Sequence, residues 1–150
     1  MAEADQTEKV QTRKIQTLRG QCLCGAVRFE IAGAVTEPHA CHCTQCRRQS
    51  GHYVVAAEAP RDAVTFLEDR GLKWYRSSAK AKRGFCGDCG SALFWASDDG
   101  DELSFNLGCL DAPTGLTLAS HIFVDEKGDY YDLDDALPKF TSDGEAMETP

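Results

Sequence analysis

The sequence predicts a mainly β domain made of several small antiparallel sheets. Two observations support this fold class. Short runs rich in Val, Phe, Tyr and Trp recur along the chain, and Gly, Pro and Asp bound them, as is usual for strands. Seven of the eight cysteines fall into three tight clusters, Cys22-x-Cys24, Cys41-x-Cys43-x-x-Cys46 and Cys86-x-x-Cys89. Such spacings are typical of the metal sites that hold small β domains together.

The expected strands follow one another with short breaks. Val27, Phe29 and Ile31 alternate with polar residues over 25–31, which predicts a strand with one apolar face. A helix or turn beginning near Thr44 is needed to gather the three sulfurs of the middle cluster. A glycine turn at 126–129 predicts a hairpin between 120–124 and 130–133, and one helical turn is expected at 134–137. Further strands are expected at 52–57, 63–67, 72–75, 92–96 and 103–107.

Length and charge limit the possible functions. The 150 residues predict one zinc-binding domain over 18–140, with a flexible arm at 1–17 and a frayed tail at 141–150. We expect no membrane span, because there is no apolar run of about 18 residues. We also expect a cytoplasmic protein, because residues 1–17 lack the apolar core of a secretory signal. The net charge of −8 disfavours nucleic acid as a partner.

The last cysteine pair predicts a structural zinc site. Cys86 and Cys89 have zinc-knuckle spacing, and Gly90 permits the tight turn around a bound sulfur. The pair Cys22 and Cys24 supplies two further thiolates, which completes a closed site of four. The alternative is a thioredoxin-like redox pair at Cys86 and Cys89, but the βαβ pattern of that fold is absent around them.

The middle cluster predicts a second zinc of a different kind. Cys41, Cys43 and Cys46 supply three thiolates and leave one coordination position open, as in zinc sites that bind a substrate. Two residues remain as possible fourth ligands that would close the site, His42 and Cys109. Three thiolates make zinc a weak Lewis acid, so an open site of this kind favours sulfur chemistry over peptide hydrolysis.

Three residues that follow this cluster and one distant histidine are candidates for the site. Arg47 and Arg48 follow the last thiolate, so one could donate to a metal-bound sulfur and the other could bind a carboxylate of a ligand. The alternative is a solvated basic pair at a helix start. Ser50 could line the pocket or only form a turn. His121 is either a buried, hydrogen-bonded histidine or an acid, base or orienting group of the pocket.

At this point the motifs resemble a known family. Residues 20–29 (GQCLCGAVRF), 41–51 (CHCTQCRRQSG) and 85–94 (FCGDCGSALF), with Leu110-Asp111 and 121–123 (HIF), are similar to those of the glutathione-dependent formaldehyde-activating enzyme and centromere protein V family. The resemblance implies an Mss4-like β-tent fold with two zinc ions per chain. It also implies that the four-cysteine set binds the structural ion and that Cys41, Cys43 and Cys46 bind the second.

The resemblance further implies a carbon–sulfur lyase or synthase that joins the glutathione thiol to formaldehyde and gives S-hydroxymethylglutathione. In that reaction Cys41, Cys43, Cys46, Arg47 and His121 would be catalytic, and Arg47, Arg48 and Ser50 would bind the co-substrate. Two alternatives stay open. One is a related zinc enzyme that uses another small electrophile without glutathione, and the other is a non-catalytic zinc-binding module.

Overall fold

The computed structural model describes residues 16–147 and is mainly β, which confirms the predicted fold class. The expected N-terminal arm falls almost wholly outside the described residues, as do residues 148–150 of the expected tail. None of the helices within 16–147 has the length and apolar composition needed to cross a membrane. The strands are β1 (Leu18–Gln21), β2 (Arg28–Ile31), β3 (His39–Cys41), β4 (Val54–Pro60), β5 (Val64–Glu68), β6 (Leu72–Arg76), β7 (Ala81–Cys86), β8 (Ala92–Ser97), β9 (Glu102–Asn106) and β10 (Ser120–Ile122).

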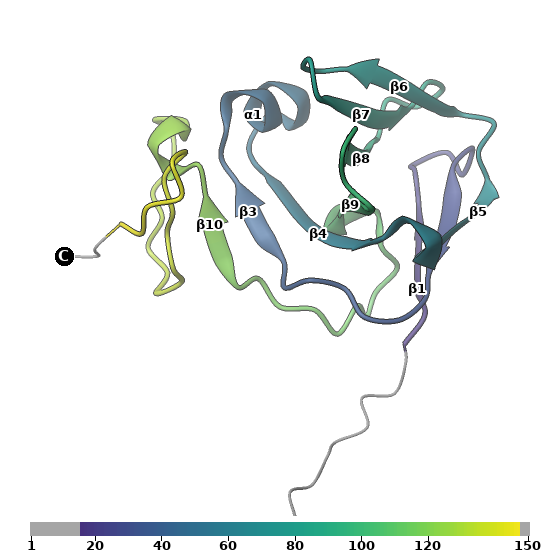
Figure 1. Cartoon of the computed structure of the whole chain (residues 1–150), viewed down its shortest axis with the longest axis horizontal. Coiled ribbons are helices and arrows are strands. Elements are labelled where there is room, and N and C mark those ends of the chain that lie inside the picture. Colours follow the sequence, from purple (N-terminus) through teal and green to yellow (C-terminus); the bar gives the residue numbers. More distant parts are fainter. Residues whose placement is uncertain (1–15, 148–150) are drawn as a thin grey trace, which may run out of the picture.

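The strands of the described segment form one small and one large sheet (Figure 1). The first has the order β1-β2-β5 and is antiparallel. The second has the order β10-β3-β4-β9-β8-β7-β6, in which β10 and β3 are parallel and the other neighbours antiparallel. The helix α1 (Thr44–Ser50) connects β3 to β4, and three short 3₁₀ turns lie at η1 (Arg61–Ala63), η2 (Leu107–Cys109) and η3 (Val124–Glu126).

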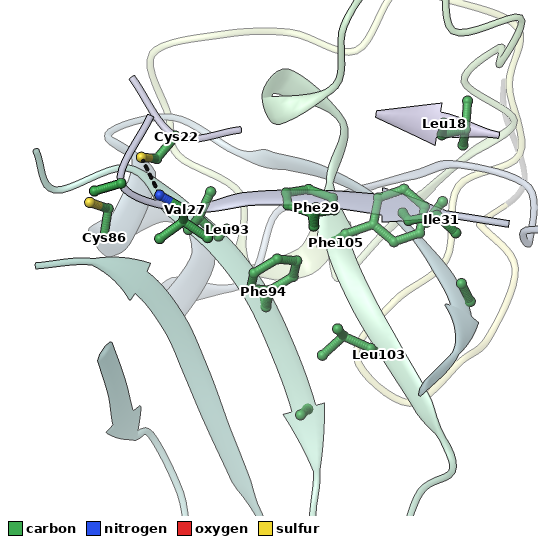
Figure 2. Close-up of a cluster of buried hydrophobic side chains, with 14 residues drawn as sticks. Leu18, Cys22, Val27, Phe29, Ile31, Cys86, Leu93, Phe94, Leu103 and Phe105 are labelled. Carbon is green, nitrogen blue, oxygen red and sulfur yellow. Dashed lines mark hydrogen bonds between the residues drawn. The ribbon is translucent and has the colours of Figure 1, made fainter. Parts of the chain in front are cut away.

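The core lies between the two sheets (Figure 2). Phe29 of β2 packs edge-on against Phe94 of β8, with ring centroids 4.9 Å apart. Phe105 of β9 and Ile31 of β2 extend the same cluster, and neither is accessible to solvent. Cys22 lies at one end of this cluster (Figure 2). The apolar face that the alternation in 25–31 predicts is therefore the face that covers the large sheet.

Six of the expected strands are present. The runs predicted at 25–31, 52–57, 63–67, 72–75, 92–96 and 103–107 correspond to β2, β4, β5, β6, β8 and β9, with ends shifted by up to three residues. The strands β1, β3 and β7 were not expected from the pattern. They are short or, in β7, contain Lys82, Arg83 and Gly84, which hide the apolar alternation.

The predicted hairpin at 120–133 and the helical turn at 134–137 are wrong. Only β10 forms, and it pairs in parallel with β3 instead of with residues 130–133. Phe123 adopts a left-handed conformation with φ of 56°, which ends β10 and turns the chain into η3. Residues 135–137 form bends instead of a helical turn. The side chain of Asp135 bonds to His121 of β10, and its carbonyl oxygen accepts from Lys139.

The C-terminal segment folds back along β10 (Figure 1). The backbone N–H of Phe140 donates to His121 O at 2.9 Å, and His121 N–H donates to Pro138 O at 2.8 Å. Residues 141–147 of the expected frayed tail return to this segment, because Met147 N–H donates to Lys139 O at 2.8 Å. The Ser142 hydroxyl also donates to Asp125 at 2.6 Å. This part of the chain is therefore held by specific hydrogen bonds.

Candidate metal centre and its cavity

The four-cysteine set comes together between the two sheets. Cys22 and Cys24 lie in the loop between β1 and β2, and Cys86 and Cys89 lie at the end of β7 and in the turn after it. The four sulfur atoms all lie within 4.8 Å of one another. The backbone at Gly71 packs so closely that a Cβ there would meet Cys86 Sγ at 3.0 Å. The sequence therefore needs glycine at this position to let the chain pass the sulfurs.

The spacing of these sulfurs fits a tetrahedral metal ion. Cys24 Sγ lies 3.7 Å from Cys22 Sγ and 3.7 Å from Cys86 Sγ. A zinc ion with Zn–S bonds of about 2.3 Å in tetrahedral geometry places its sulfurs about 3.8 Å apart. All eight cysteines are free, so Cys86 and Cys89 do not form the disulfide that the redox-pair alternative would allow. The Val27 amide N–H also donates to Cys22 Sγ at 3.2 Å, a hydrogen bond that favours the thiolate (Figure 2).

The three sulfurs of the middle cluster also come together, at the junction of β3 and α1. Cys41 ends β3, Cys43 is the N-cap of α1, and Cys46 lies one turn into that helix. Their sulfur atoms lie within 4.8 Å of one another. The prediction of a helix from Thr44 is confirmed. Gly51 ends this helix in a left-handed conformation with φ of 86°, which glycine adopts without strain.

Cys43 is the thiol of this cluster that loses its proton most readily. Hydrogen bonds from the thiols of Cys41 and Cys46 lower the pKa of Cys43 to about 2. The amide N–H of Cys46, 3.3 Å from Cys43 Sγ, acts in the same direction because it is the capping hydrogen bond of α1. A cluster that already favours a thiolate matches the donor chemistry that zinc requires, so these residues fit a metal ion.

The arginine that contacts this sulfur cluster is Arg83 of β7. Its Nη1 lies 3.6 Å from Cys46 Sγ and donates to Gln49 Oε1 at 3.0 Å. Its Nε and Nη2 both donate to Gln45 Oε1, at 3.3 and 3.2 Å. The guanidinium is thus fixed by two glutamines of α1, so that its positive charge lies beside a ligand sulfur.

The three sulfurs open onto a cavity of about 300 Å³. The strand register explains its floor, because Cys41 pairs with Val54, and Ala56 pairs with both His39 and Asn106. A second row crosses four strands from Glu58 through Ser104 and Trp95 to Arg83. Residues paired across strands point to the same face, so both rows face the cavity, and all of their residues line it. Ile122 and Phe123 complete the apolar wall.

The far end of the cavity carries a carboxyl group. Glu58 lies four residues along β4 from Val54, which places it roughly 13 Å along the strand from the position opposite Cys41. Burial raises the pKa of Glu58, and a hydrogen bond with Glu102 raises it further. Glu58 takes part in none of the four ion pairs found within residues 16–147. This end of the cavity therefore disfavours additional negative charge.

The structure places the candidates of α1 away from this cavity. Arg48 and Ser50 are exposed, and Ser50 Oγ donates to Cys46 O at 2.8 Å at the end of the helix. Arg47 is half-buried, and its Nε is the buried side-chain nitrogen without a hydrogen-bond partner in the described part of the chain. None of the three lines the cavity. The roles expected for Arg47, Arg48 and Ser50 in the pocket thus find no support in its geometry.

Neither alternative fourth ligand reaches the three sulfurs. The side chain of His42 is fully buried, and it bonds to His121 and Tyr131 rather than joining the cysteines. Cys109 packs against the main core, where its thiol donates to Ala92 O at 3.3 Å. Burial raises the pKa of Cys109 to about 11, which suits a neutral thiol. The fourth position of the cluster therefore faces the cavity.

His121 is also buried outside the cavity, where it bonds to His42 and Asp135. The Asp135 side chain is 43% exposed, and its carboxylate accepts from His121 and from Lys139. The sequence reasoning missed Arg83, Glu58 and this use of Asp135. The signal available for Arg83 was only its place in a basic run, 80–83, ahead of Cys86.

The sequence of this chain is similar to those of known proteins. Residues 17–126 match the model of the family described as glutathione-dependent formaldehyde-activating enzyme. An uncharacterized lyase of Schizosaccharomyces pombe is 29% identical over 126 residues, which cover 83% of this chain and 90% of that protein. A candidate glutathione-dependent formaldehyde-activating enzyme of Halomonas elongata is 30% identical over 89 residues, 54% of this chain and 56% of that protein.

A solved structure is similar in fold. The crystal structure of a Rhodobacter sphaeroides protein superposes with a TM-score of 0.54 and 26% sequence identity. The match covers 63% of this chain and 88% of that one. The fold of this chain is thus similar to that of a protein whose crystal structure is solved.

The four-cysteine site is expected to be required for folding. Cys86→Ser removes a buried ligand between the sheets, and a structural zinc site contributes folding free energy on the order of 10 kcal/mol in small metal domains. We expect the variant to lose its cooperative thermal transition in circular dichroism. Cys109→Ser, a conservative change of a core thiol outside both clusters, should keep that transition. A folded Cys86→Ser protein would contradict the structural role.

The three-cysteine site is expected to be dispensable for folding. Cys43→Ser leaves the four-cysteine site and the main core untouched, because Cys41, Cys43 and Cys46 belong to a separate apolar cluster. We expect a folded protein whose metal content, measured by mass spectrometry, falls from two zinc ions per chain to one. Collapse of Cys43→Ser to the same extent as Cys86→Ser would show that the division between the two sites is wrong.

Proposed function

The chain belongs to the glutathione-dependent formaldehyde-activating enzyme family, and from this premise we propose that it is a zinc-dependent carbon–sulfur lyase or synthase. Its substrate would be the adduct of glutathione, or of another small thiol, with formaldehyde or a similar small electrophile. The supporting observation is the cluster of three thiols that opens onto a cavity, while a separate cluster of four thiols supplies a complete set of zinc ligands by itself. One zinc would be structural and the other would face the substrate.

The residues that would hold the second ion are Cys41, Cys43 and Cys46. When bound there, zinc supplies a Lewis-acidic position that favours the thiolate form of an incoming thiol. The chain holds the reactants close together in a mostly apolar cavity, which excludes water and lowers the entropic part of the barrier. In the synthetic direction, the thiol sulfur bonds to the carbonyl carbon, and the π electron pair moves to the oxygen. That oxygen takes up the proton that the thiol released.

The charges of the cavity suggest how the thiol lies. Arg83 donates to the Cys46 sulfur and offsets the negative charge that accumulates around the three thiolates. Glu58, at the far end, accepts cationic or hydrogen-bond donor groups better than carboxylates. The ammonium group of the γ-glutamyl arm of glutathione is such a group, and its two carboxylates would remain at the rim. A cavity of about 300 Å³ is at the lower limit for ligand pockets, so part of the peptide would extend outside it.

The same small volume favours a second candidate, in which a compact electrophile reacts without glutathione. The two candidates differ in their requirement for a thiol at the fourth position. In both, Cys41, Cys43 and Cys46 face the reactants. Arg47 and His121 lie outside the cavity, so they would support the site and would not contact the reactants as expected.

Glutathione binding through its sulfur tests the proposal. We expect calorimetric heat on titration of the two-zinc protein with glutathione, and none with S-methylglutathione, because the methyl group blocks the sulfur. Addition of thiol to formaldehyde also proceeds without a catalyst, so we expect activity as faster exchange between formaldehyde and its adduct, measured by NMR. Cys43→Ser should abolish both effects. Absence of heat at millimolar glutathione, with two zinc ions bound, would favour the second candidate.

Arg83 is expected to strengthen metal binding at the three-cysteine site. Arg83→Gln removes the donor beside Cys46, and loss of such an outer partner typically costs about 10–100-fold in metal affinity. The affinity of the second zinc, measured by competition with a chelator, should fall by that order. Arg48→Gln is the matched control, because Arg48 is exposed on α1, the helix that carries Cys46, and does not line the cavity. Equal zinc affinities in the two variants would show that Arg83 does not strengthen metal binding.

A further inference from the structure

A chain of hydrogen bonds runs behind the three-cysteine site. His42 stands between Cys41 and Cys43 in the sequence, but its ring bonds to the far side of β3 from the cavity. Tyr131 Oη lies 2.5 Å from His42 Nδ1. His42 Nε2 lies 2.9 Å from His121 Nδ1, and His121 Nε2 lies 2.8 Å from Asp135 Oδ2. His42 and His121 are exposed to 0% and 2%, so both rings are shielded from solvent.

The partners define the direction of every hydrogen bond when both rings are neutral. The carboxylate of Asp135 only accepts, so His121 donates from Nε2 and its Nδ1 is an acceptor. His42 must then donate from Nε2 to that Nδ1. The remaining nitrogen of His42, Nδ1, accepts the hydroxyl proton of Tyr131. Both rings are therefore Nε2–H tautomers, and each of their four nitrogens is satisfied.

We propose that Tyr131, His42, His121 and Asp135 form one positioning chain, through which the C-terminal segment fixes the Cys41–Cys43 backbone and hence the three-thiolate metal site. The proposal rests on the proposed function in that it takes this cluster as a metal centre. Tyr131 and Asp135 lie beyond residues 17–126, the part of the chain that matches the family. The family match therefore covers His42 and His121 but not their two outer partners.

The geometry explains how a ring behind the strand orders sulfurs in front of it. Because side chains alternate in an extended segment, the two residues that flank a side chain held behind it project toward the opposite side. His42 is held at both ring nitrogens and through its backbone N–H, which donates to Ile122 O at 3.0 Å. The peptides on either side of it therefore cannot rotate freely, and the sulfurs of Cys41 and Cys43 stay directed toward the cavity.

The C-terminal side of the molecule holds the same site at a second place. Glu126 of η3 accepts from the backbone N–H of Thr44 at 2.8 Å, at the first residue of α1. The segment that carries Asp135 is in turn attached to β10. The Lys139 ammonium donates to Asp135, and the backbone of Lys139 forms a parallel β-bridge with His121 of β10. Figure 1 shows this segment beside β10. Residues 124–140 thus form a continuous support behind the metal site.

The test compares metal affinity in single variants of the two-zinc protein. We expect Tyr131→Phe, which removes one hydroxyl, and Asp135→Ala to weaken zinc binding at the three-cysteine site about 10-fold or more, as loss of outer partners of a metal site does. Zinc at the four-cysteine site should be unaffected. Asp135→Asn should restore near wild-type affinity, because its carboxamide oxygen still accepts from His121 Nε2. His52→Phe is the matched control, because that exposed ring packs against Tyr131 without joining the hydrogen-bonded chain.

Two spectroscopic readouts separate positioning from general stability. Cobalt substituted at the three-cysteine site should show altered ligand-field bands in Tyr131→Phe, and unaltered bands in His52→Phe. In the wild type, nitrogen-15 NMR should show both His42 and His121 as Nε2–H tautomers. Wild-type affinity and bands in folded Tyr131→Phe and Asp135→Ala would overturn the proposal while leaving the proposed function intact. A wild-type protein that binds no metal at the three cysteines would overturn both.

Discussion

The structure depends on four cysteines gathered at the sulfur–sulfur distances that a tetrahedral zinc ion requires. Cys22 and Cys24 lie in the loop that leads into the small sheet, whereas Cys86 and Cys89 lie at the end of β7 in the large one. Their sulfurs approach to 3.7 Å, where four thiolates would repel one another strongly without a positive ion. A metal bound there would join the two sheets beside the aromatic core, so the same contact would stabilise the fold and define its layers.

The second cluster places the same kind of ligand in a different setting. Cys41, Cys43 and Cys46 belong to one strand end and the helix that follows it, so an ion there does not connect the sheets. Support comes instead from neighbours, with Arg83 on the cavity side and the buried ring of His42 behind. The site is therefore rigid without being closed, which is the condition for a metal ion that exchanges its fourth ligand.

The sequence predicts what depends on short spacings. The cysteine clusters, the helix after Cys43 and the alternation around Phe29 all follow from residues within a few positions of one another. Contacts between distant segments have no such signal. Arg83 reaches Cys46 across 37 residues, and Tyr131 reaches His42 across 89. The predicted hairpin failed for the same reason, since β3 offers β10 a parallel partner that local turn residues could not reveal.

The charges inside the cavity limit what it accepts. Three thiolates around a divalent cation carry one net negative charge, and an added thiolate raises it to two. Among the lining residues that the structure describes, Arg83 alone carries an arginine or lysine charge. It already bonds to Cys46 and to two glutamines. Carboxylates therefore gain little inside, and at the far end they would add negative charge where burial and Glu102 already raise the pKa of Glu58. A ligand that enters with its sulfur first, carries a cation or no charge behind it and leaves its acids at the rim satisfies all of these constraints.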